Sequence, residues 1–83
     1  MIKPQTQNIL QELDGVQQIY KFPNGYGASV VKHMMSYGGK DDLWELAVLK
    51  GEDLCYTSPL TSDVLGWLTD DDVQRALKEI AKL

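Results

Sequence analysis

One histidine and one cysteine, His33 and Cys55, are the chain's only candidates for nucleophilic or base chemistry near neutral pH. Nothing in their spacing places them together, and they supply neither a disulfide nor a Cys/His zinc site. Carboxylate catalysis needs a second acid in a cleft, but Asp41-Asp42 and Asp70 to Asp72 stand beside turns or helix starts, where solvated carboxylates are common. The sequence therefore predicts a protein without catalytic residues, bound metal or cofactor.

Two tyrosines stand beside glycines, in Gly25-Tyr26-Gly27 and Tyr37-Gly38-Gly39. Backbone without side-chain cover lets a flat group stack on the tyrosine ring while amide N–H groups approach it, and nearby Lys or Arg can hold a phosphate. Neither stretch matches a known phosphate-binding loop, and turn formation explains the glycines as well. The candidate ligand- or partner-binding residues are Lys21, Asn24, Tyr26, Lys32, His33, Tyr37, Lys40 and Arg75.

The aromatic residues offer a second kind of surface. Trp44 and Trp67, with four tyrosines and one phenylalanine, are a large apolar share of a small domain. They either fill the core or stay partly exposed for a partner protein or a second copy. Because a sheet with one covering helix leaves a face or an edge open, a homo-oligomer is also expected.

Acidic residues outnumber basic ones by 12 to 8, which gives a formal net charge of −4. Proteins that hold duplex DNA neutralise its phosphates with clustered Lys and Arg, so this balance argues against a duplex nucleic-acid partner. No apolar run approaches the roughly 18 residues of a membrane span, and residues 1–15 lack the apolar core of a secretory signal. With its single thiol, the chain is predicted to be cytoplasmic and to have no membrane partner.

The length of 83 residues and the 43% hydrophobic fraction predict a single small domain over residues 1–83. Pro4 suits the first turn of a helix, and three apolar residues after it fall on one side, which predicts a short helix from about residue 4 to residue 13. Asp14-Gly15 would end this helix, with Gly15 in the left-handed position.

A β-hairpin is predicted next, because strand-like runs at 16–22 and 26–34 flank Pro23-Asn24-Gly25. Pro in a type I turn followed by Gly at a positive φ gives a three-residue loop that pairs Phe22 with Tyr26. The competing two-residue Asn-Gly turn would scatter the aromatic residues over both faces. The favoured pairing places Val16, Tyr20, Phe22, Tyr26, Ala28 and Val30 on an apolar face, and Lys21, Gly27, Ser29 and His33 on a polar one.

Alternating apolar residues predict a third strand at 43–49 and a short fourth strand at 54–57, while 61–68 fits either a strand or one helical turn. Thr69 as N-cap, Asp72 in a capping box and apolar residues at helical spacing predict an amphipathic helix from about 70 to 82. The expected fold is α+β: an antiparallel meander of about four strands, a short N-terminal helix, and the C-terminal helix packed on one face.

Four phrases of the sequence carry a resemblance: FPNGYGASVV at 22–31, SYGG at 36–39, LWELAV at 43–48 and PLTSDV at 59–64. Together they resemble a group of short proteins encoded by tailed phages and prophages, and the likeness covers about residues 20–68. The group brings no activity or site residue with it. The resemblance implies a setting, a phage gene expressed in the cytoplasm of an infected bacterium, in which small non-enzymatic proteins commonly act by binding.

Three functions fit these expectations. The first is an accessory protein that binds a host defence or replication protein through an exposed aromatic and acidic surface. The second is a sponge that sequesters a nucleotide-derived signalling molecule in the Tyr/Gly loops, with the site built between subunits. The third is a structural or assembly protein of the phage. An enzyme is not expected, since another subunit would have to supply the missing catalytic groups.

Overall fold

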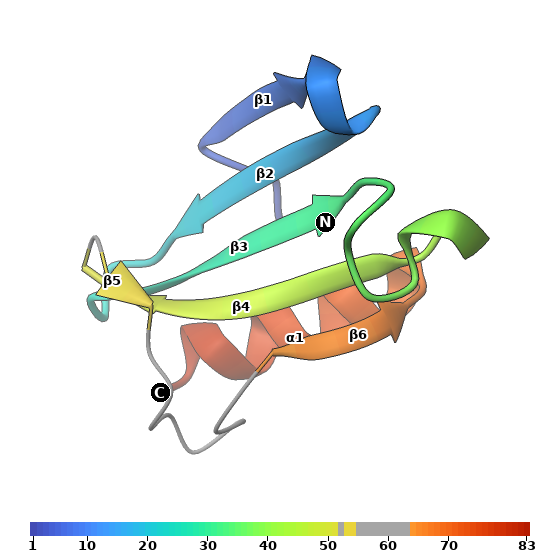
Figure 1. Cartoon of the computed structure of the whole chain (residues 1–83). Coiled ribbons are helices and arrows are strands. Elements are labelled where there is room, and N and C mark those ends of the chain that lie inside the picture. The colour runs from blue at the N-terminus through green and yellow to red at the C-terminus, as the bar shows by residue number, and fades with distance from the viewer. Residues whose placement is uncertain (52, 55–63) are drawn as a thin grey trace.

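The computed structural model of the chain describes residues 1–51, 53–54 and 64–83. Its strands form one antiparallel sheet in the order β1-β2-β3-β4-β5, and β6 pairs with β4 (Figure 1). The strands are β1 (Thr6–Leu10), β2 (Gly15–Lys21), β3 (Tyr26–Lys32), β4 (Trp44–Lys50), β5 (Asp53–Leu54) and β6 (Leu65–Leu68), followed by the helix α1 (Asp70–Ala81). The α+β class and the meander are confirmed, but the path through the described residues has five strands rather than four, with β6 beside it.

Strand β4 is the centre of the helix-covered half of the sheet. One of its edges pairs with β3 from Tyr26↔Lys50 to Val31↔Glu45. Since a strand has two hydrogen-bonding edges, β6 and β5 share the other one: β6 pairs near Trp44 and β5 near Lys50. The predicted third strand is thus confirmed with a shift of one residue.

The hydrophobic core lies between α1 and one face of β2, β3 and β4. The alternation of side chains along each strand directs one set of residues towards the helix, and the helical spacing directs one face of α1 towards the sheet. The residues of this core are Tyr20, Ala28, Val30, Leu46 and Val48 from the sheet and Val73, Ala76, Leu77 and Ile80 from the helix. Phe22 and Tyr26 pack against it partly buried, whereas Val16, which was predicted on this face, is not part of it.

The β2–β3 hairpin has the predicted three-residue loop. The register pairs Tyr20 with Ala28 and Lys21 with Gly27, and the Phe22 N–H donates to the Tyr26 carbonyl oxygen at 2.9 Å. Gly25 has φ +89° and donates its N–H to the Phe22 carbonyl, as a bulge glycine after a type I turn does. Strand β3 ends at Lys32, two residues earlier than predicted, so His33 lies in the following loop.

The predicted helix over residues 4–13 is wrong. Thr6–Leu10 is instead β1, which pairs with β2 from Thr6↔Ile19 to Leu10↔Gly15, and a 3₁₀ turn at Gln11–Leu13 connects the two strands. Three apolar residues are too few to stabilise an isolated short helix, whereas the free edge of β2 offers backbone hydrogen bonds to an extended segment. Side-chain amides reinforce this pairing: Asn8 donates to Gln17 at 3.2 Å, and Gln18 donates to Gln7 at 3.1 Å.

The role predicted for Gly15 also changes. Asp14, with φ 50°, is the left-handed residue of this connection, and Asp tolerates that conformation better than most residues. Gly15 is required for a different reason: a Cβ there would lie 2.2 Å from the Lys32 carbonyl oxygen and 2.4 Å from the His33 Cβ. The glycine therefore permits the close approach of β2 to the end of β3.

Helix α1 begins as predicted. Thr69 is its N-cap and accepts a hydrogen bond from the Asp72 N–H at 3.1 Å, while Asp72 accepts one from the Thr69 N–H at 3.0 Å. These two bonds form a capping box and satisfy donors that the first turn leaves without partners. At the other end, the Asn24 side chain of the hairpin loop donates to the carbonyl oxygens of Ile80 at 2.8 Å and Leu83 at 3.1 Å. The hairpin therefore holds the C-terminal end of the helix.

The first residues of the chain attach to the helix through one side chain. The Ile2 N–H donates to Gln74 Oε1 at 2.9 Å, and Gln74 Nε2 donates to the Ile2 carbonyl oxygen at 3.0 Å. Ile2 also packs against the core. These two hydrogen bonds attach the start of the chain to α1.

Two of the predicted segments are described in part. Of the fourth strand predicted at 54–57, Asp53–Leu54 is β5, and residues 55–57, including Cys55, lie outside the described residues. Of the segment 61–68, residues 65–68 are the strand β6, which confirms the strand alternative there, and residues 61–63 lie outside the described residues.

Asp72→Asn tests the capping box through its dependence on pH. Hydrogen bonds from the backbone N–H and side chain of Thr69, then the interaction with Arg75, hold the pKa of the Asp72 carboxyl below its ordinary value. A carboxyl whose pKa is lower in the folded state contributes stability above its unfolded pKa, and this contribution is lost as the pH falls through the folded value. We expect Asp72→Asn to lower the free energy of unfolding at neutral pH, and this deficit to shrink as the solution is acidified below about pH 4. Urea titrations at several pH values measure it.

The control is Asp71→Asn, which removes a neighbouring carboxylate that takes no part in the capping box. An equal acid-dependent change in both variants would show that the effect is general helix electrostatics rather than the box.

Candidate binding surface

Strand β6 contains a β-bulge that turns Trp67 away from the sheet. The pairs Trp44↔Leu68 and Leu46↔Leu65 are two residues apart on β4 but three residues apart on β6, so β6 holds one extra residue. Trp67 has φ 54°, in the left-handed region that a bulky residue rarely adopts. Its N–H donates to the Tyr37 carbonyl oxygen at 3.2 Å. The bulge thus ties β6 to the loop between β3 and β4.

That loop is fixed by a buried serine. Ser36 Oγ accepts a hydrogen bond from the His33 N–H at 3.0 Å and donates one to the His33 carbonyl oxygen at 2.9 Å. The His33 ring takes part as well, because its Nδ1 accepts from the Met35 N–H at 3.0 Å. At the next residue, the Tyr37 N–H donates to the Glu45 carboxylate at 3.2 Å. These bonds hold the backbone of the loop from His33 to Tyr37.

Tyr37 and Trp67 stack on each other at the surface. Their ring centroids are 5.4 Å apart with an interplanar angle of 28°, and the residues are 56% and 58% exposed. Such stacking contributes about 0.5–1.5 kcal/mol beyond the area that it buries. The two residues, called here the Tyr37–Trp67 pair, present the outer parts of both rings to solvent.

Two glycines let these segments approach. A Cβ on Gly38 would lie 2.9 Å from the Trp67 Cα, and one on Gly66 would lie 2.7 Å from the Tyr37 Cβ. Gly38 also has φ +91°, which favours glycine. The contact between the loop and β6 is therefore backbone to backbone, and this closeness places the two rings against each other.

More exposed apolar side chains lie in the same loop. Met34 is half exposed and Met35 is 73% exposed, and they precede Tyr37 by three and two residues. The 3₁₀ turn η2 (Gly39–Asp41) follows the loop and carries the exposed side chains of Lys40 and Asp41. The loop thus presents apolar and aromatic side chains next to charged ones, the composition of a contact surface with a polar rim.

Three of the predicted binding residues line one hollow beside this loop. It has a volume of about 420 Å³, and Lys32, His33 and Lys40 contribute to its wall. Asp14 and Asp42 line it too, so its charge is mixed. Lys32 is already engaged: its Nζ lies 3.2 Å from the Asp42 carboxylate and 4.3 Å from the centroid of the Trp44 ring.

The other five predicted residues lie elsewhere. Tyr37 is in the pair described above. Arg75 is on the outer face of α1 and forms an ion pair with Asp72 at 2.6 Å. Asn24 uses its amide within the protein, towards the end of α1 and, through Oδ1, the Tyr26 N–H. Tyr26 is partly buried against the core, with the Lys50 ammonium 5.4 Å from the centroid of its ring. Asn24 and Tyr26 therefore have structural roles in the hairpin. Tyr37, Arg75, Asn24 and Tyr26 do not lie together in one site.

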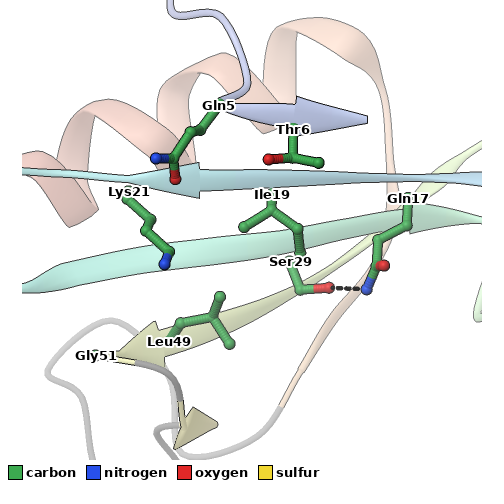
Figure 2. Close-up of a pocket in the computed structure, with 8 residues that line it drawn as sticks. All are labelled: Gln5, Thr6, Gln17, Ile19, Lys21, Ser29, Leu49 and Gly51. Carbon is green, nitrogen blue, oxygen red and sulfur yellow. Dashed lines mark hydrogen bonds between the residues drawn. The ribbon is translucent and has the colours of Figure 1, made fainter. Parts of the chain in front are cut away.

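Lys21 lies on the face of the sheet opposite to α1. Figure 2 shows it beside Ile19, Ser29 and Leu49 in a hollow of about 450 Å³ that β1, β2, β3 and β4 line. Gln17 crosses the floor and donates to Ser29 Oγ at 3.0 Å. The polar face predicted for the hairpin is thus confirmed for Lys21 and Ser29, but the hollow holds no second charged side chain among its lining residues.

The sequence analysis named Trp67 only among the aromatic residues that either fill the core or stay exposed for a partner, and it did not single out Met34 or Met35. A glycine directly before a tryptophan in a short strand was the available signal, because Gly inside a strand often marks a bulge or a close approach. Within residues 1–51, 53–54 and 64–83, no three His, Cys, Asp or Glu side chains gather to hold a metal ion. In the same residues, no helix is long and apolar enough to cross a bilayer.

Gly38→Ala tests whether the glycine contact builds the Tyr37–Trp67 pair. The added methyl group meets the Trp67 backbone, so we expect it to separate the two rings. We also expect it to lower the free energy of unfolding by about 1–3 kcal/mol beyond the loss that a Cβ at a positive φ causes by itself. Near-ultraviolet circular dichroism reports the stacking, and urea unfolding reports the stability.

Gly25→Ala is the matched control, since Gly25 has nearly the same φ and no atom within 4 Å of the added Cβ. Equal losses in the two variants, with the aromatic signal retained, would assign the whole effect to backbone conformation and remove the contact with Trp67 from the explanation.

No model of a known family, no curated protein and no solved structure matches this chain. The fold and the surface therefore take no function from a relative. What they do has to be argued from their geometry and chemistry, and the resemblance to the phage-encoded group stays a prediction from the sequence.

Proposed function

We propose that this chain acts by binding a protein partner and that the Tyr37–Trp67 pair is the centre of the contact surface. The observation that carries the proposal is the pair itself: two large rings, each more than half exposed, stacked at a bulge in which Trp67 is left-handed. Tyr and Trp are the residues most enriched where protein interfaces concentrate their binding energy. The proposal requires no catalytic group.

Contacts within the chain hold both segments of the pair in place before a partner binds. The backbone bond from Trp67 to Tyr37, the Glu45 carboxylate on the Tyr37 N–H and the close glycine contacts fix both segments. Binding then orders few additional side-chain rotamers, so little entropy is lost when a partner covers the rings. A rigid aromatic pair is the kind of anchor that fits a pocket on another protein.

The charged residues near the pair indicate which charges a partner surface would carry. The chain has a formal net charge of −4, and the turn that follows the loop carries the exposed side chains of both Lys40 and Asp41. A complementary surface has an apolar pocket for the rings, charged residues of both signs at its rim and a positive net charge. If the resemblance to phage-encoded proteins holds, that partner is a defence or replication protein of the bacterial host; a component of the phage particle would use the same surface.

Trp67→Ala tests this proposal. Immobilised wild-type chain is expected to retain one protein in stoichiometric amount from lysate of an infected bacterium. Because residues at the centre of an interface contribute 2 kcal/mol or more, Trp67→Ala is expected to weaken that interaction by about 30-fold or more. Titration of the captured protein against both variants measures the dissociation constants.

Ile9→Ala is the control, since Ile9 is a comparably exposed apolar residue on β1, 68% exposed. It should bind as the wild type does. The proposal is contradicted if Trp67→Ala binds the partner with unchanged affinity. It is also contradicted if the wild-type chain captures no protein in stoichiometric amount.

A second candidate function is sequestration of a nucleotide-derived signal. One observation favours it: the hollow of about 420 Å³ brings Lys32, His33 and Lys40 together beside the loop that carries Tyr37. The two lysine side chains would hold phosphate groups in this hollow. The two aspartates in the wall and the ion pair of Lys32 weaken its attraction for anions, so this function ranks second.

Thermal unfolding with a panel of nucleotides tests it. A ligand at about 100 times its dissociation constant stabilises the folded state by about 2.7 kcal/mol, which raises the Tm of a domain of this size by about 10–20 °C. Lys40→Ala is expected to reduce that shift, and Lys78→Ala, on the exposed side of α1, to leave it unchanged. No shift with any nucleotide removes this candidate.

A further inference from the structure

Strand β1 is the edge of the sheet. It pairs with β2, and none of the segments that the structure describes pairs with its other side (Figure 1). An edge strand presents backbone N–H and C=O groups outward, and these groups can pair with another strand. At about 3.4 Å per residue, the five residues of β1 offer an edge of about 17 Å.

Proteins usually protect such an edge, and this one has no protection within the strand. Residues 5–11 contain no Lys, Arg, Asp, Glu, Pro or Gly, although the chain as a whole is about a quarter charged. Edge lysines, inward charges, prolines and glycine bulges are the usual means of preventing pairing between edges. In addition, Thr6 to Ile9 are all exposed, with Ile9 at 68%.

A second copy of the chain fits this edge better than an acidic or basic segment of another protein does. The β1 strands of both copies are uncharged, so their pairing leaves no charge without a partner. The amides of β1 already pair with amides across the strand on the inner side, Asn8 with Gln17 and Gln7 with Gln18. The Gln7 and Asn8 side chains of a second β1 would lie next to those of the first β1, along the edge that faces away from β2. The net charge of −4 on each chain repels copies elsewhere, and β1 is where that charge is locally absent.

The geometry of the sheet restricts how two copies pair. When identical edges join antiparallel, the two-fold axis is perpendicular to the sheet, so residues of the same face lie opposite each other. In such a register the two-fold axis passes through a pair of identical residues and not between two residues. If the axis passes through the Ile9 pair, the two Ile9 side chains lie directly opposite each other. If it passes through the Asn8 pair, the two Ile9 side chains are diagonal neighbours at about 7–8 Å. In either case both helices lie on the same side of one continuous sheet.

We propose that the chain forms a two-fold symmetric dimer in which the β1 strands pair antiparallel, with the two Ile9 side chains adjacent at the dimer axis. The dimer extends the sheet across both copies and leaves the Tyr37–Trp67 pair of each copy outside the interface. One strand pair is a small contact, so the dimer forms in a concentration-dependent manner.

Light scattering combined with size exclusion tests the proposal. The mass of the wild-type chain is expected to rise from 9.3 kDa towards twice that value as concentration increases over about two decades. Ile9→Lys and Ile9→Glu place like charges side by side at the axis and should each keep the mass of one chain at every concentration. An equimolar mixture of these two variants pairs opposite charges and should restore the dimer, which neither variant could do if it had simply unfolded.

Met35→Lys is the matched control: it puts the same charge on a similarly exposed apolar residue outside the sheet, and it should dimerise as the wild type does. A wild-type mass that stays at one chain throughout overturns the proposal. So does a dimer that survives Ile9→Lys, or a mixture of the Lys and Glu variants that stays monomeric while both are folded by circular dichroism.

Discussion

The width of one helix determines how this small domain is built. An α-helix of twelve residues is about 18 Å long and about 10 Å across with its side chains, whereas neighbouring strands are about 4.8 Å apart. One helix therefore covers about two to three strands, and α1 covers the half of the sheet centred on β3 and β4 (Figure 1). Among the described residues, the fully buried side chains of the sheet, such as Val30 and Leu46, lie in that half, and Leu77 of α1 belongs to the same core.

The other half has to be held by different means. Across β1 and β2 the cross-strand contacts are amide hydrogen bonds, such as Asn8 to Gln17, and such bonds contribute about 1 kcal/mol or less each when exposed. Gln74 holds the start of the chain to α1 through two bonds to Ile2. The β1 edge thus lies outside the helix-covered half of the sheet and has an open backbone, so we expect local opening and pairing with another strand to concentrate there.

The elements that the sequence predicts well are those whose signals are local. Pro23-Asn24-Gly25 determines a loop within three residues, and Thr69 with Asp72 determines a helix start within four. The prediction of a helix for the N-terminal segment failed because the state of this segment depends on backbone pairing with β2, the next strand in the chain, and not on its own apolar spacing. The site was predicted in part for the same reason: residue types suggested Tyr37 and the lysines, but Trp67 reaches Tyr37 through a bulge that exists only once β6 pairs with β4.

Trp67 combines a left-handed backbone with a side chain that the isolated chain buries only in part. A left-handed bulky residue costs about 1–3 kcal/mol, and the stacking with Tyr37 returns about 0.5–1.5 kcal/mol, while more than half of the residue stays in water. A glycine at this position would keep the backbone bond to Tyr37 without the strain. A second surface that covers both rings would add the hydrophobic contribution of the ring surface that the isolated chain leaves in water. In the proposed complex, binding and the conformation of β6 would therefore be linked: a partner that covers the pair would also stabilise the bulge that presents it.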